Sequence, residues 1–152
     1  MLIDNIRNWI RIGIGNNDAG TALADHVDEL NAARSVTPDD SEGTDNTILA
    51  GERRIDVGAV TNDANDFIVL PALADVPVGH EITILCNAGT NFELRTPASS
   101  GEEINSEDCD GTKEYLCTDT QIVKVIKISD TIGWMAHGYS AIGAVVTAVI
   151  PD

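Results

Sequence analysis

The N-terminal part of the chain carries apolar side chains at helical spacing. In the first segment they recur at intervals of three and four residues, with polar residues between them, which predicts a short amphipathic helix. Gly13 and Gly15 end this segment, and Asn17 or Asp18 is placed to cap a second helix that runs to about Arg34. Neither helix has enough apolar surface for a core of its own, so we expect both to dock on the rest of the chain or on another subunit. The residues expected to anchor the first helix on a partner are Leu2, Ile6, Trp9 and Ile10.

A polar segment follows these helices. Between Thr37 and Glu52 the chain consists mainly of Ser, Thr, Asn, Gly, Pro and acidic residues, a composition typical of linkers and long loops. The pattern therefore predicts a helical arm at residues 1–36, a linker or long loop at residues 37–52 and a β domain at residues 53–152.

The β domain is predicted from a change of period. After Arg53 the spacing of apolar residues shortens from near 3.6 to near 2, and β-branched residues gather in short runs between turn-forming residues. Evenly spaced runs of this kind predict a mainly β, antiparallel sandwich, jelly roll or barrel. In the run Ile122–Ile128, Lys124 and Lys127 interrupt the apolar pattern, which predicts a bulge or a sheet edge. The predicted strands are Arg54–Val60, Phe67–Leu70, Glu81–Cys86, Phe92–Thr96, Glu114–Cys117, Ile122–Ile128, Gly133–Tyr139 and Ala144–Ile150.

The composition is that of a folded but strongly acidic protein. The chain has 25 Asp and Glu against 9 Lys and Arg, a net charge of −16, and its 43% hydrophobic residues suffice for a core. Nucleic acid and anionic membranes repel such a surface, so we expect neither as a partner. The charge is typical of a marine or high-salt setting, where salt screens the repulsion, or of a protein displayed in many copies on a particle.

Two further patterns bear on where the protein is made. The sequence has no apolar stretch of the roughly 18 residues that a membrane-spanning helix needs, and no signal-peptide pattern at its start, so we expect synthesis without export. It has three cysteines, an odd number that argues against a secreted disulfide framework. We expect reduced thiols, with Cys109 and Cys117 as the pair that would form a disulfide if one formed.

The sequence gives little indication of catalysis. No nucleophile signature and no metal-ligand spacing among its His and Cys residues is evident. The loop at Asp108–Gly111 fits the middle of a calcium-loop template, but Ser106 and Cys117 stand where its end carboxylates should be. The sequence therefore predicts no catalytic residue, no cofactor-binding residue and no metal ligand.

The C-terminal part of the chain is predicted to form subunit contacts. Its last strand carries no charge before Asp152, so both faces are expected to be covered, one of them by a neighbouring subunit. This favours an oligomer, with a homotrimer as our prediction. The candidate contact residues, taken from the last two strands, are Trp134, Met135, Tyr139, Val145 and Val149.

A series of turn and strand motifs follows in order between Phe67 and Trp134. They are Ile68-Val69-Leu70-Pro71, Pro77-Val78-Gly79, Ile82-Thr83-Ile84, Asn87-Ala88-Gly89, Phe92–Pro97, Gly101–Asn105 and Gly133-Trp134. This order resembles the β domain of many tailed-virus virion proteins, especially capsid decoration (cement) proteins and related fibre or knob domains. Two features depart from that pattern: Ser106 replaces a Gly, and an acidic insertion follows at Glu107–Asp110.

The resemblance implies a small β-rich protein, often a homotrimer, on the outer surface of a capsid. Such a protein is assembled in the host cytoplasm and adds contact area between copies of the major capsid protein, with no catalysis and no cofactor. Two alternatives stay open. One is a turret, fibre, knob or tail-associated virion protein. The other is a carbohydrate-binding host-attachment module, for which Trp134 and Tyr139 would have to supply exposed rings.

Overall fold

The computed structural model describes residues 32–60, 65–111, 113–140 and 145–146, the last pair by backbone alone. The chain divides into two compact units, Met1–Ala32 and Ala33–Asp152, and the described residues belong almost entirely to the second, which we call the β unit. The two predicted N-terminal helices lie outside the described residues, apart from the end of the second helix. The predicted end of the second helix at about Arg34 is wrong, because Arg34 already belongs to a strand.

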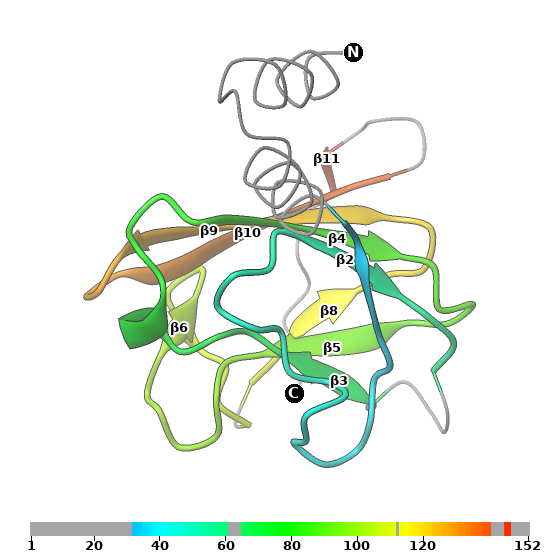
Figure 1. Ribbon diagram of the computed structural model, residues 1–152, viewed down its shortest axis with the longest axis horizontal. Helices are drawn as coiled ribbons and strands as arrows, with labels where there is room; N and C mark the ends of the chain where they lie inside the picture. The colour runs from blue at the N-terminus through cyan, green and yellow to red at the C-terminus, as the bar shows by residue number, and fades with distance from the viewer. Residues whose placement is uncertain (1–31, 61–64, 112, 141–144, 147–152) are drawn as a thin grey trace, which may run out of the picture. The chain divides into compact units, whose positions relative to one another are not determined.

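The β unit is mainly β, as predicted. It has a large sheet in the order β1-β2-β4-β9-β10-β6-β7, with β11 also paired to β10, and a small sheet in the order β3-β5-β8. Figure 1 shows β4, β9 and β10 in one layer, with β3, β5 and β8 in a second layer. The elements are β1 (Arg34–Val36), β2 (Arg54–Val57), β3 (Phe67–Val69), the 3-10 helix η1 (Leu73–Asp75), β4 (Glu81–Cys86), β5 (Phe92–Arg95), β6 (Glu103–Ile104), β7 (Glu107–Asp108), β8 (Tyr115–Cys117), β9 (Ile122–Ser129), β10 (Gly133–Tyr139) and β11 (Val145–Val146).

Every predicted strand overlaps an observed one, but the sheets are mixed and not purely antiparallel. β1 pairs with β2, β2 with β4, β3 with β5 and β6 with β10 in parallel. The reason lies in the chain path: between β2 and β5, successive strands alternate between the two sheets, so a strand returning to its sheet runs parallel to the one before it. The turns that join β2, β3, β4 and β5 therefore do not make hairpins, whereas β9 forms a hairpin with β10 and β6 forms one with β7.

The core lies between the two sheets. Alternate residues of β4, β9 and β10 face inward, and their registers place them side by side: Ile82 pairs with Val125, which pairs with Ala136. All three are buried, as are Phe92 and Leu94 of the small sheet. The period of two in the sequence thus marks the inward face correctly.

β9 is irregular but is not an edge. It lies between β4 and β10, so the predicted edge is wrong, whereas the predicted bulge is found at its end: Gly133 pairs with Ser129 and Trp134 with Lys127, which leaves Ile128 of β9 as the extra residue. The inward row of β9 is Val123, Val125 and Lys127, and the Lys127 side chain is only 3% exposed. Its ammonium group is accommodated there because it donates to two main-chain carbonyls and pairs with one carboxylate, which satisfies its hydrogen-bonding capacity.

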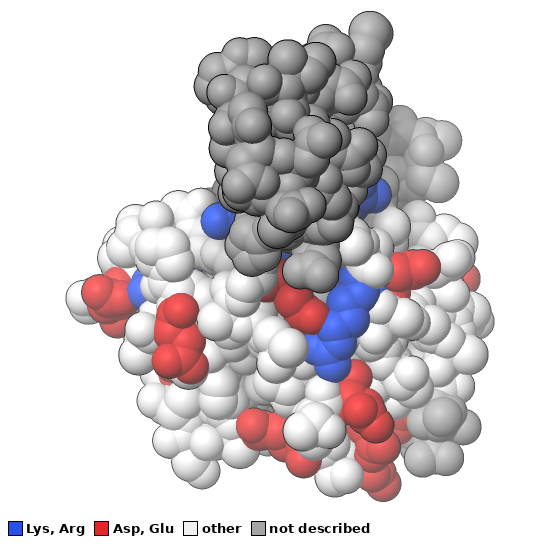
Figure 2. Space-filling view, in the orientation of Figure 1, with Lys and Arg blue, Asp and Glu red and all other residues white. Residues whose placement is uncertain are grey.

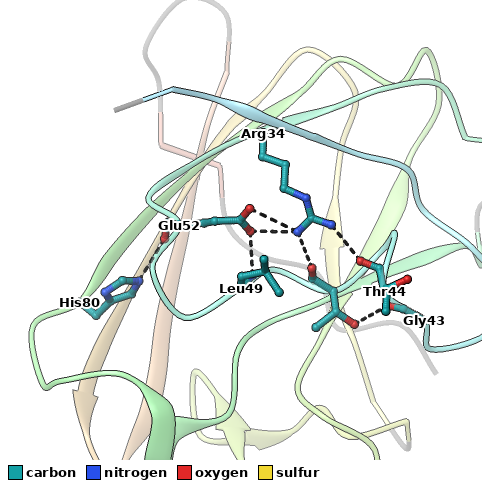
Figure 3. Close-up of polar contacts among 7 residues, drawn as sticks. Arg34, Gly43, Thr44, Leu49, Glu52 and His80 are labelled. Carbon is teal, nitrogen blue, oxygen red and sulfur yellow. Dashed lines mark hydrogen bonds and ion pairs between the residues drawn. The ribbon is translucent and has the colours of Figure 1, made fainter. Parts of the chain in front are cut away.

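The segment at residues 37–52 is a long loop of the β unit, which was one of the two predicted alternatives, and not a linker. The Arg34 guanidinium on β1 donates to the carbonyl oxygens of Thr47 and Thr44, each at 2.8 Å, and pairs with Glu52 at 3.0 Å (Figure 3). Ile48 of this segment is buried in the core, and its N–H bonds to β3. Composition alone therefore did not show that hydrogen bonds hold this loop against a strand of each sheet.

The three cysteines are free and buried. The pair expected from spacing, Cys109 and Cys117, forms no disulfide; the Cys117 thiol instead hydrogen-bonds with Cys86, and burial raises its pKa well above the usual range. Burial also raises the pKa of the Cys109 thiol to about 11. Thiols with raised pKa values are weak nucleophiles at neutral pH, so Cys109 and Cys117 behave as core residues.

Candidate functional site

The outward face of the large sheet carries the residues best placed to contact a partner. Side chains alternate along a strand, so the residues between the buried ones on β4, β9 and β10 point away from the core. Register places Glu81 in one row with Ile126 and Met135. Four residues further along β4, Leu85 lies in a row with Ile122 and Tyr139. We call this surface the outward face. Its members are Arg54, Asp56, Glu81, Thr83, Leu85, Ile122, Lys124, Ile126, Met135, His137 and Tyr139.

Apolar side chains interrupt the polar surface on this face. Ile122 is 43% exposed and Met135 is 40% exposed, and Leu85, Ile126 and Tyr139 are partly exposed. They stand on adjacent strands in two rows, Ile126 with Met135 and Leu85 with Ile122 and Tyr139, on either side of the polar row formed by Thr83, Lys124 and His137. Grouped exposed apolar residues are typical of interaction surfaces.

The charges on the outward face balance. Arg54 and Lys124 contribute two positive charges, and Asp56 and Glu81 contribute two negative ones, so the face has no net charge with His137 neutral, while the whole chain carries −16. The Lys124 ammonium lies 2.9 Å from Glu81, and this hydrogen bond raises the pKa of Lys124. Figure 2, which views another side of the molecule, shows acidic side chains spread over the surface and basic ones confined to a few places. The outward face is therefore a place where electrostatic repulsion between copies of this acidic protein is weak.

The structure divides the predicted contact residues. Met135 and Tyr139 lie on the outward face. Trp134 points the opposite way and is 1% exposed, and its indole N–H has no hydrogen-bond partner among the described residues. The burial follows from strand alternation and makes Trp134 a core residue of its own chain. The Val145 backbone pairs with Tyr139; Val149 and the predicted arm anchors Leu2, Ile6, Trp9 and Ile10 lie outside the described residues.

Sequence reasoning missed two contributors to this face, Ile122 and Ile126. The signal was present in the run Ile122–Ile128, whose odd and even positions carry two different patterns. Because the run was treated as one apolar pattern interrupted by Lys124 and Lys127, its two faces were not separated. In fact Val123 and Val125 face inward, and Ile122, Lys124 and Ile126 share the outward face.

Burial of Trp134 also bears on sugar binding. A carbohydrate platform requires an aromatic ring whose face is open to the ligand. Trp134 offers none, and Tyr139 is only partly exposed. The paired aromatic platform that this alternative required is therefore not formed.

The described part of the chain contains no group of three or more His, Cys, Asp or Glu residues arranged to hold a metal ion. At the calcium-like loop, Asp110 instead accepts a hydrogen bond from the Gly101 N–H. No helix within the described ranges is long and apolar enough to cross a membrane.

No protein-family model matches this chain, and no curated protein matches its sequence.

Proposed function

We propose that this chain is a non-enzymatic virion structural protein: a capsid decoration (cement) protein that binds the outside of the major capsid lattice and stabilises it as a homotrimer. The observation that carries the proposal is the outward face, which is partly apolar and has no net charge, on a protein of charge −16. The ordered series of motifs from Phe67 to Trp134 supports it through the resemblance to virion β domains.

In this proposal the outward face joins copies of the chain. Two bodies of charge −16 repel at every approach, and the repulsion is weakest where the local charge is balanced. Ile122 and Met135, both substantially exposed in the single chain, would lose water contact in the oligomer, at about 25 cal/mol per Å² of apolar area buried. The N-terminal arm, with its apolar residues Leu2, Ile6, Trp9 and Ile10, is then available for the major capsid protein.

The first test measures mass in solution by light scattering coupled to size exclusion. We expect three times the 16.1 kDa of the monomer for the native chain. Met135→Glu should give monomers, because it places a charge in the contact. Leu49→Glu is the matched control: Leu49 is 57% exposed but lies on a loop outside the outward face, so that variant should stay trimeric. A native monomer, or an equal effect of both substitutions, would remove the outward face from the proposal.

The second test concerns the particle. Antibodies against the β unit should label the whole outer surface of intact virions, and quantitative mass spectrometry should find the chain in copy numbers comparable to the major capsid protein. Labelling restricted to vertices or to the tail would favour the alternative, a turret, fibre or tail-associated protein. Absence from purified virions would refute the virion assignment.

A further inference from the structure

Two of the three cysteines lie side by side in the core, one on each sheet. Cys86 is the last residue of β4 in the large sheet, and Cys117 is the last residue of β8 in the small sheet. Both belong to the inward rows of their strands, and they are 2% and 0% exposed. The Cys117 thiol hydrogen-bonds with Cys86, so the two sulfur atoms are neighbours across the interface between the sheets.

The backbone around this pair is held by the turn that joins β8 to β9. The Thr120 N–H donates to the Cys86 carbonyl oxygen at 2.7 Å, and the Cys86 N–H donates to the Gln121 carbonyl oxygen at 2.9 Å. The Gln121 N–H donates to the Thr118 carbonyl oxygen at 3.2 Å, which closes the turn directly after Cys117. The two strand ends that carry the thiols are therefore tied to each other, and the contact between the sulfur atoms is a fixed feature of the fold.

The third cysteine has different surroundings. Cys109 follows β7 and is 2% exposed. The charged groups that act on its thiol are the carboxylates of Glu114, Asp108 and Glu107. The three buried thiols thus comprise one contacting pair and one thiol outside it, which allows the pair to be tested against an internal control.

The pair is well placed for a covalent bond. A disulfide brings two sulfur atoms to about 2.0 Å from each other, and thiols that already share a hydrogen bond need only a short movement to reach that distance. The bond would close a loop of about 30 residues, long enough to restrict the unfolded chain substantially. It would also join β4 to β8, and thereby one sheet to the other.

We infer that Cys86 and Cys117 form a reversible disulfide that joins the two sheets when the protein meets a small-molecule disulfide such as oxidised glutathione. One thiol loses its proton and attacks a sulfur of the oxidant, which expels one small thiolate. The other thiol then loses its proton and attacks the protein-bound sulfur, which forms the Cys86–Cys117 bond and expels the second small thiolate. The two protons pass to the two small thiols, so the pair is oxidised and the oxidant reduced by two electrons. The inference concerns the β unit alone and does not depend on the proposed function.

The reaction takes place in an open state of the turn after Cys117. In the closed state both residues are buried, and burial raises the pKa of the Cys117 thiol, so that little thiolate forms. Thr120 in the turn is exposed and has a φ of +66°, a conformation that a β-branched residue rarely adopts. Local opening of this turn breaks its two hydrogen bonds to Cys86 and admits the oxidant. The disulfide is therefore expected to form slowly and to persist once formed.

The test equilibrates the full-length protein in buffers of reduced and oxidised glutathione. One sample starts folded and reduced, and a second starts reduced in urea and refolds in the same buffer. N-ethylmaleimide in denaturant then blocks the free thiols, intact mass counts them, and peptide mapping identifies the linked residues. We expect one free thiol, Cys109, and a Cys86–Cys117 link from both starting points, formed faster during refolding because both thiols are then accessible. Dithiothreitol should restore the three free thiols of the reduced chain.

Two variants and a stability measurement complete the test. Cys109→Ala is the matched control, since it removes a buried thiol outside the pair, and it should form the same link. Cys117→Ala should leave Cys86 unlinked. The oxidised native chain should melt at least about 5 °C above the reduced chain, and glutathione should produce no such rise in Cys117→Ala. Peptide mapping of the native chain decides the question even if a variant fails to fold.

Three results would each overturn the inference. They are three free thiols at every glutathione ratio from both starting points, a link that includes Cys109, and a linked chain that melts no higher than the reduced one.

Discussion

At Gly133, where β10 begins, the backbone permits no other residue. Its φ is +81°, and a Cβ there would collide with the Glu103 carbonyl oxygen. The close approach is what lets β6 lie parallel to β10 at Trp134. This Gly therefore sets both the bulge and the contact between two strands.

Replacing Gly133 by Ala should lower the free energy of unfolding by at least about 2 kcal/mol, because strain at positive φ and a steric clash add. Urea denaturation monitored by circular dichroism measures the change. Gly89→Ala separates the two causes, since Gly89 has a φ of +77° but nothing within 4 Å of the point where a Cβ would lie; it should cost about 1 kcal/mol. A Gly133→Ala effect no larger than that of Gly89→Ala would contradict the clash.

His80 should make stability depend on pH. Its ring is buried at 3% exposure and Nε2 lies 3.1 Å from the Glu52 carbonyl oxygen (Figure 3). Burial, and then repulsion from Arg53, lower its pKa below the usual 6.5. The unfolded chain therefore binds this proton more readily, so stability is complete above pH 6.5 and falls as the pH drops below that value.

The measurement is urea unfolding between about pH 7 and about pH 5, where one proton changes the free energy by at most about 1.4 kcal/mol per pH unit. His80→Gln should flatten this dependence. His137→Gln, on the exposed outward face, should leave the slope unchanged. Equal slopes in the native chain and in His80→Gln would show that another group is responsible.

At the scale of elements, β9 has two faces with opposite requirements. Lys127 points inward and holds the segment around η1, whereas Lys124, three residues earlier, is 45% exposed and paired with Glu81. A buried ammonium group with three contacts is hard to replace, because its removal leaves buried carbonyl oxygens without donors.

Lys127→Met should therefore destabilise the fold by about 3 kcal/mol, and Lys124→Met by much less, because the ion pair of Lys124 with Glu81 is exposed to solvent. The two variants make the same chemical change on one strand, so each is the control of the other. Thermal and urea unfolding give both values. A loss of similar size in the two variants would mean that Lys127 contributes no more than a surface ion pair.

The same strand shows what could be predicted from sequence. The period of two located β2, β4, β9 and β10, because burial of one face leaves a pattern in the chain. Which strands pair with each other was harder to predict. The alternation of β2, β3, β4 and β5 between two sheets leaves no pattern in the local sequence. β1 was missed because a strand as short as Arg34–Val36 cannot show a period of two in its apolar residues. β6 and β7 were missed for the same reason.

The candidate sites were predictable to different degrees. Met135 and Tyr139 were found as contact residues because they are apolar and lie on a strand. Trp134, their neighbour, was assigned together with them, although alternation places it in the core. A cleft lined by residues 73–78, 100–103 and 127–133 had no sequence signal, since these three segments meet only in the folded chain.

For the whole molecule, the dominant quantity is the net charge of −16 on 152 residues. Self-repulsion of this size destabilises a compact state and any assembly of it, and salt screens it over a Debye length of about 10 Å at 0.1 M.

Thermal stability and the trimer fraction should both rise as sodium chloride is increased from about 0.02 M to about 0.5 M. Differential scanning fluorimetry and light scattering measure the two effects. Sucrose at matched osmolality is the control, since it stabilises by exclusion from the surface and does not screen charge. A melting temperature indifferent to salt would rule out repulsion as the limiting factor.

The alternation of strands between sheets also has a consequence for synthesis on the ribosome. β4 ends at Cys86, and its partner β9 begins only at Ile122, so β4 leaves the ribosome well before the strand that covers its edge. Pairing between strands distant in sequence is slow, and unpaired edges invite association between nascent chains. The acidic residues already made, with few basic ones among them, keep neighbouring nascent chains apart during this interval. The charge that opposes assembly of the finished protein thus protects the unfinished one.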